Sequence, residues 1–207
     1  MRKKNSLIST VTIILFSSVF LSGWTGTWKD IRKESENIQS ISSTFTQTKH
    51  MRILSKPLVS KGKFYFKIPD SIRWEYLSPV KSILLMHRGI VKKYIPGPQS
   101  FIEDTGSYLQ SMNVILQDIA LWSKGQFKNN KNFTAVLKSG DVPKVILTPK
   151  DRSLAEIIER IEIALMPNKS AIINSITISE GEENYTVFEF STVEINQTID
   201  DSLFRNP

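Results

Sequence analysis

Residues 61–76, with the sequence KGKFYFKIPDSIRWEY, contain two runs in which polar and apolar side chains alternate. The runs span 61–68 and 72–76, and the turn-forming sequence Pro69-Asp70-Ser71 separates them. Because successive side chains of a strand point to opposite faces, each run predicts a strand with one apolar face. Together they predict neighbouring strands of an antiparallel sheet that buries one face and exposes the other to water.

Similar patterns occur on both sides of this stretch and bring the total to about ten predicted strands. The further strands are predicted at 44–48, 82–87, 91–95, 133–137, 144–148, 161–165, 171–179 and 185–195. The last two form a hairpin across Gly181-Glu182-Glu183-Asn184. The register of this hairpin stays open, because a shift by one residue would exchange its two faces.

Helical periodicity occurs in three places. Before the first strand, one face of an amphipathic helix is predicted from the spacing of three and four between Trp28, Ile31, Ser35, Ile38 and Ile41. A broad apolar stripe from Tyr108 to Trp122 predicts a second helix that ends near Gly125. A short helix is predicted at 153–158.

These elements predict a mainly β fold with α. A long antiparallel sheet has to curl or close, because its edge strands are otherwise unpaired. We therefore expect an unclosed, incomplete antiparallel β-barrel, that is, a highly curved sheet, covered by a helical lid. From the residues alone, the apolar concave face either holds a ligand or is filled by its own side chains.

The first residues have the layout of a secretory signal peptide. Arg2, Lys3 and Lys4 precede an apolar run from Leu7 to Leu21, after which small residues follow. We expect residues 1–23 to be removed on export and residues 24–207 to form a single domain, which is long enough for a substantial core. An uncleaved membrane anchor is the alternative, and the run is at the short end for a spanning helix.

Charge is distributed unevenly along the chain. The formal net charge is +7, and it falls to +4 when the three basic residues of the leader are removed. Between Lys49 and Lys93, eleven Lys and Arg face only two acidic residues, whereas residues 94–207 carry a net charge of −5. This polarity indicates either an electrostatically steered partner or anionic surface, or a set of solvated strand faces. No nucleic-acid motif accompanies the basic residues, so nucleic acid is not expected as a partner.

The sequence offers little for covalent or metal chemistry. It contains no Cys and only two His, His50 and His87, which excludes disulfides, thiol nucleophiles and Cys-ligated zinc. Motifs of serine hydrolases, zinc proteases and nucleotide-binding loops are missing. The acidic pairs Glu182-Glu183 and Asp200-Asp201 are read as solvated turn residues rather than a carboxylate dyad. No catalytic residue, metal site or cofactor is therefore predicted.

A set of short motifs is shared with a known family. Phe45-Thr46-Gln47 is followed by Pro57–Phe66, then by Ile72–Tyr76 after Pro69, and by Ser82–Leu85 after Pro79. Leu147-Thr148-Pro149 and Ile199–Phe204 stand near the C-terminus. In this order and spacing, over nearly all of the mature chain, the motifs resemble the periplasmic outer-membrane lipoprotein carrier family, LolA.

The resemblance implies an unclosed β-barrel with a helical lid over a hydrophobic cavity for acyl chains. It implies a periplasmic carrier without enzymatic activity or cofactor, which takes lipoproteins, or a related acylated lipid, from an inner-membrane ABC exporter to an outer-membrane acceptor. We expect such a carrier to be a monomer.

Strand parity and the resemblance together give a set of site residues. Phe64, Phe66 and Ile68 share one strand face, Ile72, Trp74 and Tyr76 share another, and Trp74 aligns with a Trp of the family. The expected acyl-chain-binding residues are Phe45, Phe64, Phe66, Ile68, Ile72, Trp74, Tyr76 and Leu85. The expected lid residues are Leu109, Met112, Ile115, Leu116 and Ile119.

The chain also departs from the family. In the family, an Arg precedes the Pro of the turn and bonds to the lid, but here Ile68 precedes Pro69. The latching role is therefore not carried over. The patterns Phe45-x-Gln47-x-Lys49 and Pro57-Leu58-x-Ser60-x-Gly62 are similar to a divergent branch found beside lipid-biosynthetic genes, so that the cargo can be a different acylated molecule.

Two other classes of function stay open at this point. A secreted envelope protein with a structural or interaction role would have a solid core and no lipid ligand. An esterase acting on acyl chains would need a nucleophile and a base in the cavity, and the sequence identifies neither.

Overall fold

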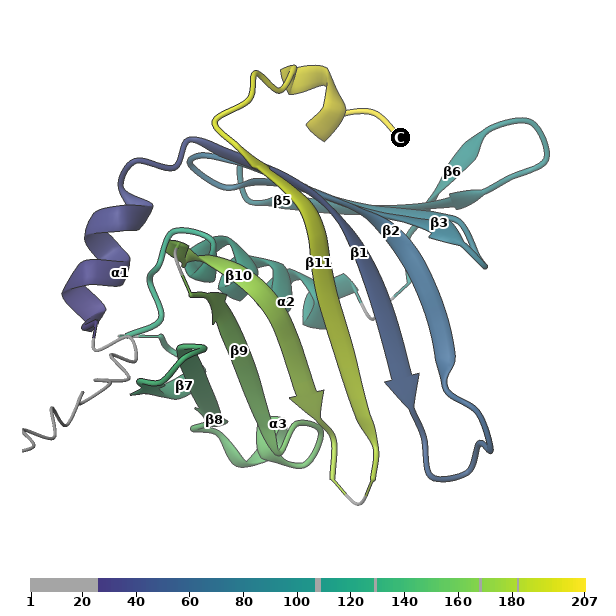
Figure 1. Ribbon diagram of the computed structural model, residues 1–207. Helices are drawn as coiled ribbons and strands as arrows, with labels where there is room; N and C mark the ends of the chain where they lie inside the picture. Colours follow the sequence, from purple (N-terminus) through teal and green to yellow (C-terminus); the bar gives the residue numbers. More distant parts are fainter. Residues whose placement is uncertain (1–25, 107–108, 129, 168, 182) are drawn as a thin grey trace, which may run out of the picture.

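The computed structural model describes residues 26–106, 109–128, 130–167, 169–181 and 183–207, so the expected signal peptide lies outside the described residues. Eleven strands form one antiparallel sheet that curls around a concave face without closing (Figure 1). The strands are β1 (Ser40–His50), β2 (Leu58–Lys67), β3 (Ser71–Ser78), β4 (Ser82–His87), β5 (Ile90–Pro96), β6 (Phe101–Asp104), β7 (Phe133–Lys138), β8 (Lys144–Pro149), β9 (Arg160–Met166), β10 (Lys169–Ser179) and β11 (Tyr185–Ile195).

The order of the strands is β6-β5-β4-β3-β2-β1-β11-β10-β9-β8-β7. Two series of hairpins, one from each half of the chain, therefore meet at the centre of the sheet, where the first strand pairs with the last. In that pair, Phe45 of β1 lies opposite Phe190 of β11. The expected fold class, an unclosed and highly curved antiparallel sheet with helices, is confirmed.

Helices lie on the concave side and at one end of the sheet, and a short 3₁₀ helix lies on the convex side (Figure 1). They are α1 (Trp28–Ser35), α2 (Leu109–Trp122), α3 (Arg152–Ala155) and the 3₁₀ helix η1 (Asp201–Phe204). Helix α1 packs against β10, and its Ser35 hydroxyl donates a hydrogen bond of 2.8 Å to the carbonyl of Lys124, just beyond α2. Helix α2 crosses the concave face and contacts β3 and β5.

Two expectations about the elements are wrong in part. Helix α1 ends at Ser35, and Ile41 belongs to β1, where it pairs with Phe66. The strand forms there because residues 40–50 pair on both sides, with β2 and with β11, which satisfies more backbone groups than a longer isolated helix would. Strand β6 was not predicted, since its four residues follow Pro96-Gly97-Pro98 and are too short to show a pattern.

The C-terminal segment covers the opposite, convex face of the sheet. Helix η1 packs on β3 and β4, and its Phe204 is fully buried. Arg73 of β3 holds the segment in place: its guanidinium donates to the carbonyls of Leu203 at 3.1 Å and Asn206 at 2.7 Å, and pairs with Glu75 at 2.9 Å. A buried arginine with these partners fixes the last residues of the chain to the sheet.

Replacing Arg73 by Met should therefore lower the free energy of unfolding by about 2–3 kcal/mol, because charged hydrogen bonds are lost in a buried place. Chemical denaturation checks the value. Lys138→Met, on the exposed surface of β7, serves as the control and should change stability by less than about 0.5 kcal/mol. Equal losses in both variants would contradict this role of Arg73.

Candidate functional site

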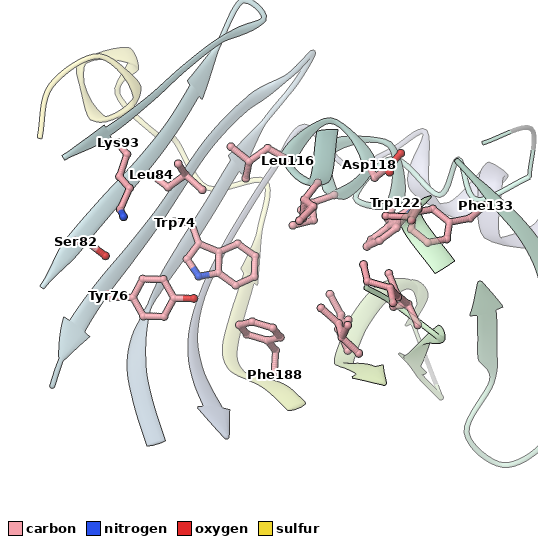
Figure 2. A pocket seen from close by; sticks show the side chains of 17 residues that line it. Trp74, Tyr76, Ser82, Leu84, Lys93, Leu116, Asp118, Trp122, Phe133 and Phe188 are labelled. Carbon is pink, nitrogen blue, oxygen red and sulfur yellow. The ribbon is translucent and has the colours of Figure 1, made fainter. Parts of the chain in front are cut away.

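A cavity of about 220 Å³ lies between the concave face of the sheet and the helices. Its walls come from both halves of the chain and from α2 (Figure 2). Almost all of the lining side chains are aliphatic or aromatic. An apolar cavity with a few polar groups is the kind of site that binds small apolar ligands.

The first wall belongs to the N-terminal half. Trp74 and Tyr76 point inward from β3, and Leu84 points inward from β4. The pairing of Trp74 with Leu84 explains this arrangement, because residues directly opposite each other in a ladder project to the same face. The polar residues Ser82 and Lys93 complete this wall near Tyr76 (Figure 2).

The second wall belongs to the C-terminal half. Ile176 and Ile178 of β10 line the cavity together with Ile161 of β9 and Phe188 of β11. The register puts Ile176 opposite Phe188 and Ile178 opposite Ile161, so these four side chains share the concave face. The two halves of the sheet thus face each other across the cavity.

Helix α2 covers the cavity with one apolar face. Ile115, Leu116, Ile119 and Trp122 all line it, at spacings that repeat along one side of a helix. Leu116 and Trp122 are nearly fully buried, whereas Ile115 is 44% exposed. Ile115 therefore lies at the margin of the covered helix face, whereas the next residue, Leu116, is fully covered.

Three polar groups around the cavity are paired with protein atoms, whereas the buried indole nitrogens of Trp74 and Trp122, which also line it, have no hydrogen-bond partner among the described residues. The Tyr76 hydroxyl donates a 2.7 Å hydrogen bond to Gln47 Oε1, and burial raises the pKa of Tyr76 to about 12, so the phenol stays neutral. The Asp118 carboxylate accepts hydrogen bonds from the side-chain amides of Asn130 at 2.7 Å and Asn132 at 3.0 Å. Lys93 pairs with Asp104 at 3.4 Å. These groups are satisfied by their neighbours and present no nucleophile activated by a base.

An aromatic cluster in the core packs against the side chains of the first wall. The ring of Phe45 lies 5.0 Å from that of Trp74, 5.3 Å from Tyr76 and 6.1 Å from Phe188, measured between centroids. Phe45 is 2% exposed and belongs to the core. It fixes the cavity-facing aromatic rings without lining the cavity itself.

The cavity opens at one end of the sheet. Besides Ile115 of α2, six half-buried residues line it: Tyr76, Ser82, Lys93, Leu154, Ile178 and Phe188. Most of them lie beside the β3–β4 turn, α3 and the β10–β11 turn, which are at the same end of the strands of the sheet. The buried lining residues, such as Leu116 and Trp122, lie deeper under α2. A ligand would therefore enter past the β3–β4 turn and α3.

Five of the predicted site residues line this cavity: Trp74, Tyr76, Ile115, Leu116 and Ile119. Phe64 lines a smaller neighbouring cavity of about 30 Å³ together with Trp74. Phe45, Phe66 and Ile72 are buried in the core on the concave side but do not line either cavity. Leu109 and Met112 belong to α2, but their side chains lie outside the described residues.

Two predicted residues are placed elsewhere. Leu85 pairs with Arg73 and therefore projects to the convex face, where it is buried near the C-terminal segment. The expectation that it lines the cavity is wrong, and its neighbour Leu84 takes that place. Ile68 follows β2 in the turn before Pro69, is 38% exposed and lines no cavity.

Sequence reasoning missed the second wall. Ile161, Ile176, Ile178 and Phe188 were predicted to be in strands, but their facing could not be assigned without the register. Within the described residues, no group of three or more His, Cys, Asp or Glu is placed to hold a metal ion. In the same part of the chain, none of the helices has the length and apolar character needed to cross a bilayer.

Comparison with known proteins agrees with this architecture. Residues 36–206 match the family described as outer membrane lipoprotein carrier protein LolA. No curated protein sequence matches the chain.

The solved structures that the chain matches are distant in sequence. A LolA superfamily protein from Nitrosomonas europaea is 10% identical, with a TM-score of 0.44 over 86% of this chain and 97% of its own. A DUF1329 family protein from Desulfovibrio piger is 12% identical, with a TM-score of 0.47 over 86% and 95%. The Pseudomonas aeruginosa MucA/MucB complex gives 13% identity and a TM-score of 0.48, over 86% of this chain and 59% of the other. Because the family profile matches residues 36–206, which is most of this chain, the chain belongs to the LolA family.

Proposed function

We propose that this protein is a periplasmic carrier that holds the acyl chains of a lipoprotein, or of a related acylated lipid, in its apolar cavity. In this proposal it receives the cargo from an inner-membrane ABC exporter and delivers it to an outer-membrane acceptor. The observation that supports the proposal most directly is the apolar cavity between two facing walls of one curved sheet, under a helix with a matching apolar face. Membership of the LolA family supports it independently.

The energetics of an acyl chain set the requirement for such a carrier. Each methylene kept from water contributes about 0.8 kcal/mol, so a sixteen-carbon chain represents about 13 kcal/mol. A carrier has to offset most of this cost and still release its cargo. A removable apolar cover meets both demands, because the cover and the cargo compete for the same wall.

Helix α2 has the features of that cover. Its lining side chains, Ile115, Leu116 and Ile119, occupy the space between the two walls. Because these side chains and the cargo compete for the same walls, we expect α2 to move outward as cargo enters.

Tryptophan fluorescence tests the proposal, because Trp74 and Trp122 both line the cavity. Adding a palmitoylated peptide should change the emission of the folded protein in a saturable way, and the same peptide without its acyl chain should not. Trp74→Phe should remove a large share of the change. Native mass spectrometry of protein isolated from its own periplasm should show bound acylated cargo.

A flat titration of folded protein with the acylated peptide, together with mass spectra free of lipid, would instead favour the alternative. In that case the protein is an envelope protein with a structural or interaction role, whose cavity is only a packing defect of its core.

A further inference from the structure

Large apolar side chains are exposed at the end of the strands where the cavity opens. They lie in the β1–β2 loop and the start of β2, and at the end of β3 and in the β3–β4 turn. Ile53 is 80% and Val80 72% exposed, and the others are exposed by two fifths or more. We refer to these six residues as the apolar rim: Ile53, Leu54, Leu58, Val59, Leu77 and Val80. An exposed cluster of this kind marks an interaction surface more often than a set of scattered apolar residues does.

The apolar rim lies directly beside the cavity opening. Leu77 follows Tyr76 in the chain, and Val80 is two residues before Ser82, both of which line the cavity. The two parts of the rim are neighbours, because Lys61 of β2 pairs with Ser78 of β3. An acyl chain that enters or leaves past the β3–β4 turn therefore passes the rim.

Basic side chains accompany the apolar rim. Residues 51–61 and 77–81 contain four of them, all exposed, and no Asp or Glu: Arg52, Lys56, Lys61 and Lys81. Among the acidic residues of the adjacent β10–β11 turn, Glu180 is paired with Lys49 at 3.2 Å, and Glu183 shares a groove with Arg52. The β1–β4 side of the opening is thus both apolar and positively charged.

We infer that the apolar rim docks on the surface of an anionic lipid bilayer. Apolar side chains on a basic surface are complementary to such a membrane. The apolar side chains enter the boundary between headgroups and acyl chains, and the basic side chains are attracted to the negative charge of the lipids. A docked opening would let an acyl chain pass between the bilayer and the cavity without crossing water. The purpose of the docking rests on the proposed function, whereas the docking itself does not require a bound cargo.

Vesicle sedimentation tests the inference. The chain from residue 24 onward, which contains every described element, is mixed with vesicles of phosphatidylcholine alone or with about one third phosphatidylglycerol. We expect binding to the anionic vesicles at least about tenfold tighter than to the neutral ones, and a steep loss at about 1 M salt, where the Debye length is about 3 Å. Equal binding to both vesicles, or binding to neither, would overturn the inference and favour a protein acceptor.

Variants separate the two contributions. Ile53→Ser with Val80→Ser should weaken binding to anionic vesicles at least about tenfold, since each removes apolar surface from the membrane interface. The control is the double variant Ile90→Ser/Val136→Ser, at apolar positions that are more than half exposed and belong to other parts of the sheet, and its binding should stay within about twofold. For the basic residues, the double variant Lys56→Gln/Lys81→Gln should weaken binding to anionic vesicles about tenfold. The control double variant Lys128→Gln/Lys131→Gln should not weaken it. Equal effects in the rim and control pairs would contradict docking through the rim.

The acylated-peptide titration keeps this inference apart from the proposed function. The rim variants should retain the fluorescence response of the folded cavity. A protein that binds the peptide but no vesicles disproves the docking and leaves the carrier intact. A protein that binds anionic vesicles through the rim but no acylated peptide disproves the carrier and leaves the docking.

Discussion

Replacing Ile178 by Trp is expected to lower the affinity for an acylated peptide by at least about tenfold, while the free energy of unfolding falls by no more than about 1–2 kcal/mol. Ile178 lines the cavity near its opening and is only partly buried. A larger ring there can enter the existing space of about 220 Å³ instead of displacing packed core side chains. The ring would then occupy the path of the ligand.

The preceding residue supplies the control. Thr177 projects to the other face of β10, so Thr177→Trp adds the same ring outside the cavity. Fluorescence titration with the palmitoylated peptide should show near-normal affinity for Thr177→Trp and weak binding for Ile178→Trp. If both variants bind the peptide as the unchanged protein does, the cavity is not the acyl-chain site.

The strands of the N-terminal half could be predicted because their side chains alternate. Trp74 and Tyr76 face the cavity as strand parity requires, and the limits of β4 and β11 were predicted correctly. The facing of side chains could not be predicted in strands whose polar and apolar residues do not alternate. Ile83, Leu84, Leu85 and Met86 form a continuous apolar run because both faces of β4 are buried, one by the core and one by the C-terminal segment. Only the pairing of Leu84 with Trp74 decides which of them faces inward.

The second wall depends on contacts that no local pattern contains. Ile176 and Phe188 come to face Trp74 because β1 and β11, at opposite ends of the chain, pair at the centre of the sheet. The family resemblance gave the architecture, but it did not give the register of the last hairpin. The same limit applies to the apolar rim: Val80 and Ile53 fall outside the predicted strands, and their position relative to the cavity depends on how the strands pair and curve.

Replacing Phe45 by Ala should lower the free energy of unfolding by about 3–5 kcal/mol, because a large buried ring is lost and its space stays empty. Phe45 contacts Trp74, Tyr76 and Phe188, so three cavity-facing rings lose their common support. Its partner across β2 is Gly62, where an added Cβ would lie 2.5 Å from Cζ of the ring, so the neighbouring strand has no side chain that could fill the gap.

Chemical denaturation measures the loss, and the emission of Trp74 reports the consequence for the site. The control is Phe101→Ala on the edge strand β6, where the ring is partly exposed and outside the core, and it should cost no more than about 1 kcal/mol. Phe45→Ala should also weaken binding of the acylated peptide under conditions where the variant is folded, since Trp74 and Tyr76 can then shift into the space that Phe45 leaves. A variant as stable as the Phe101 control would mean that the aromatic rings of the first wall hold their places without Phe45.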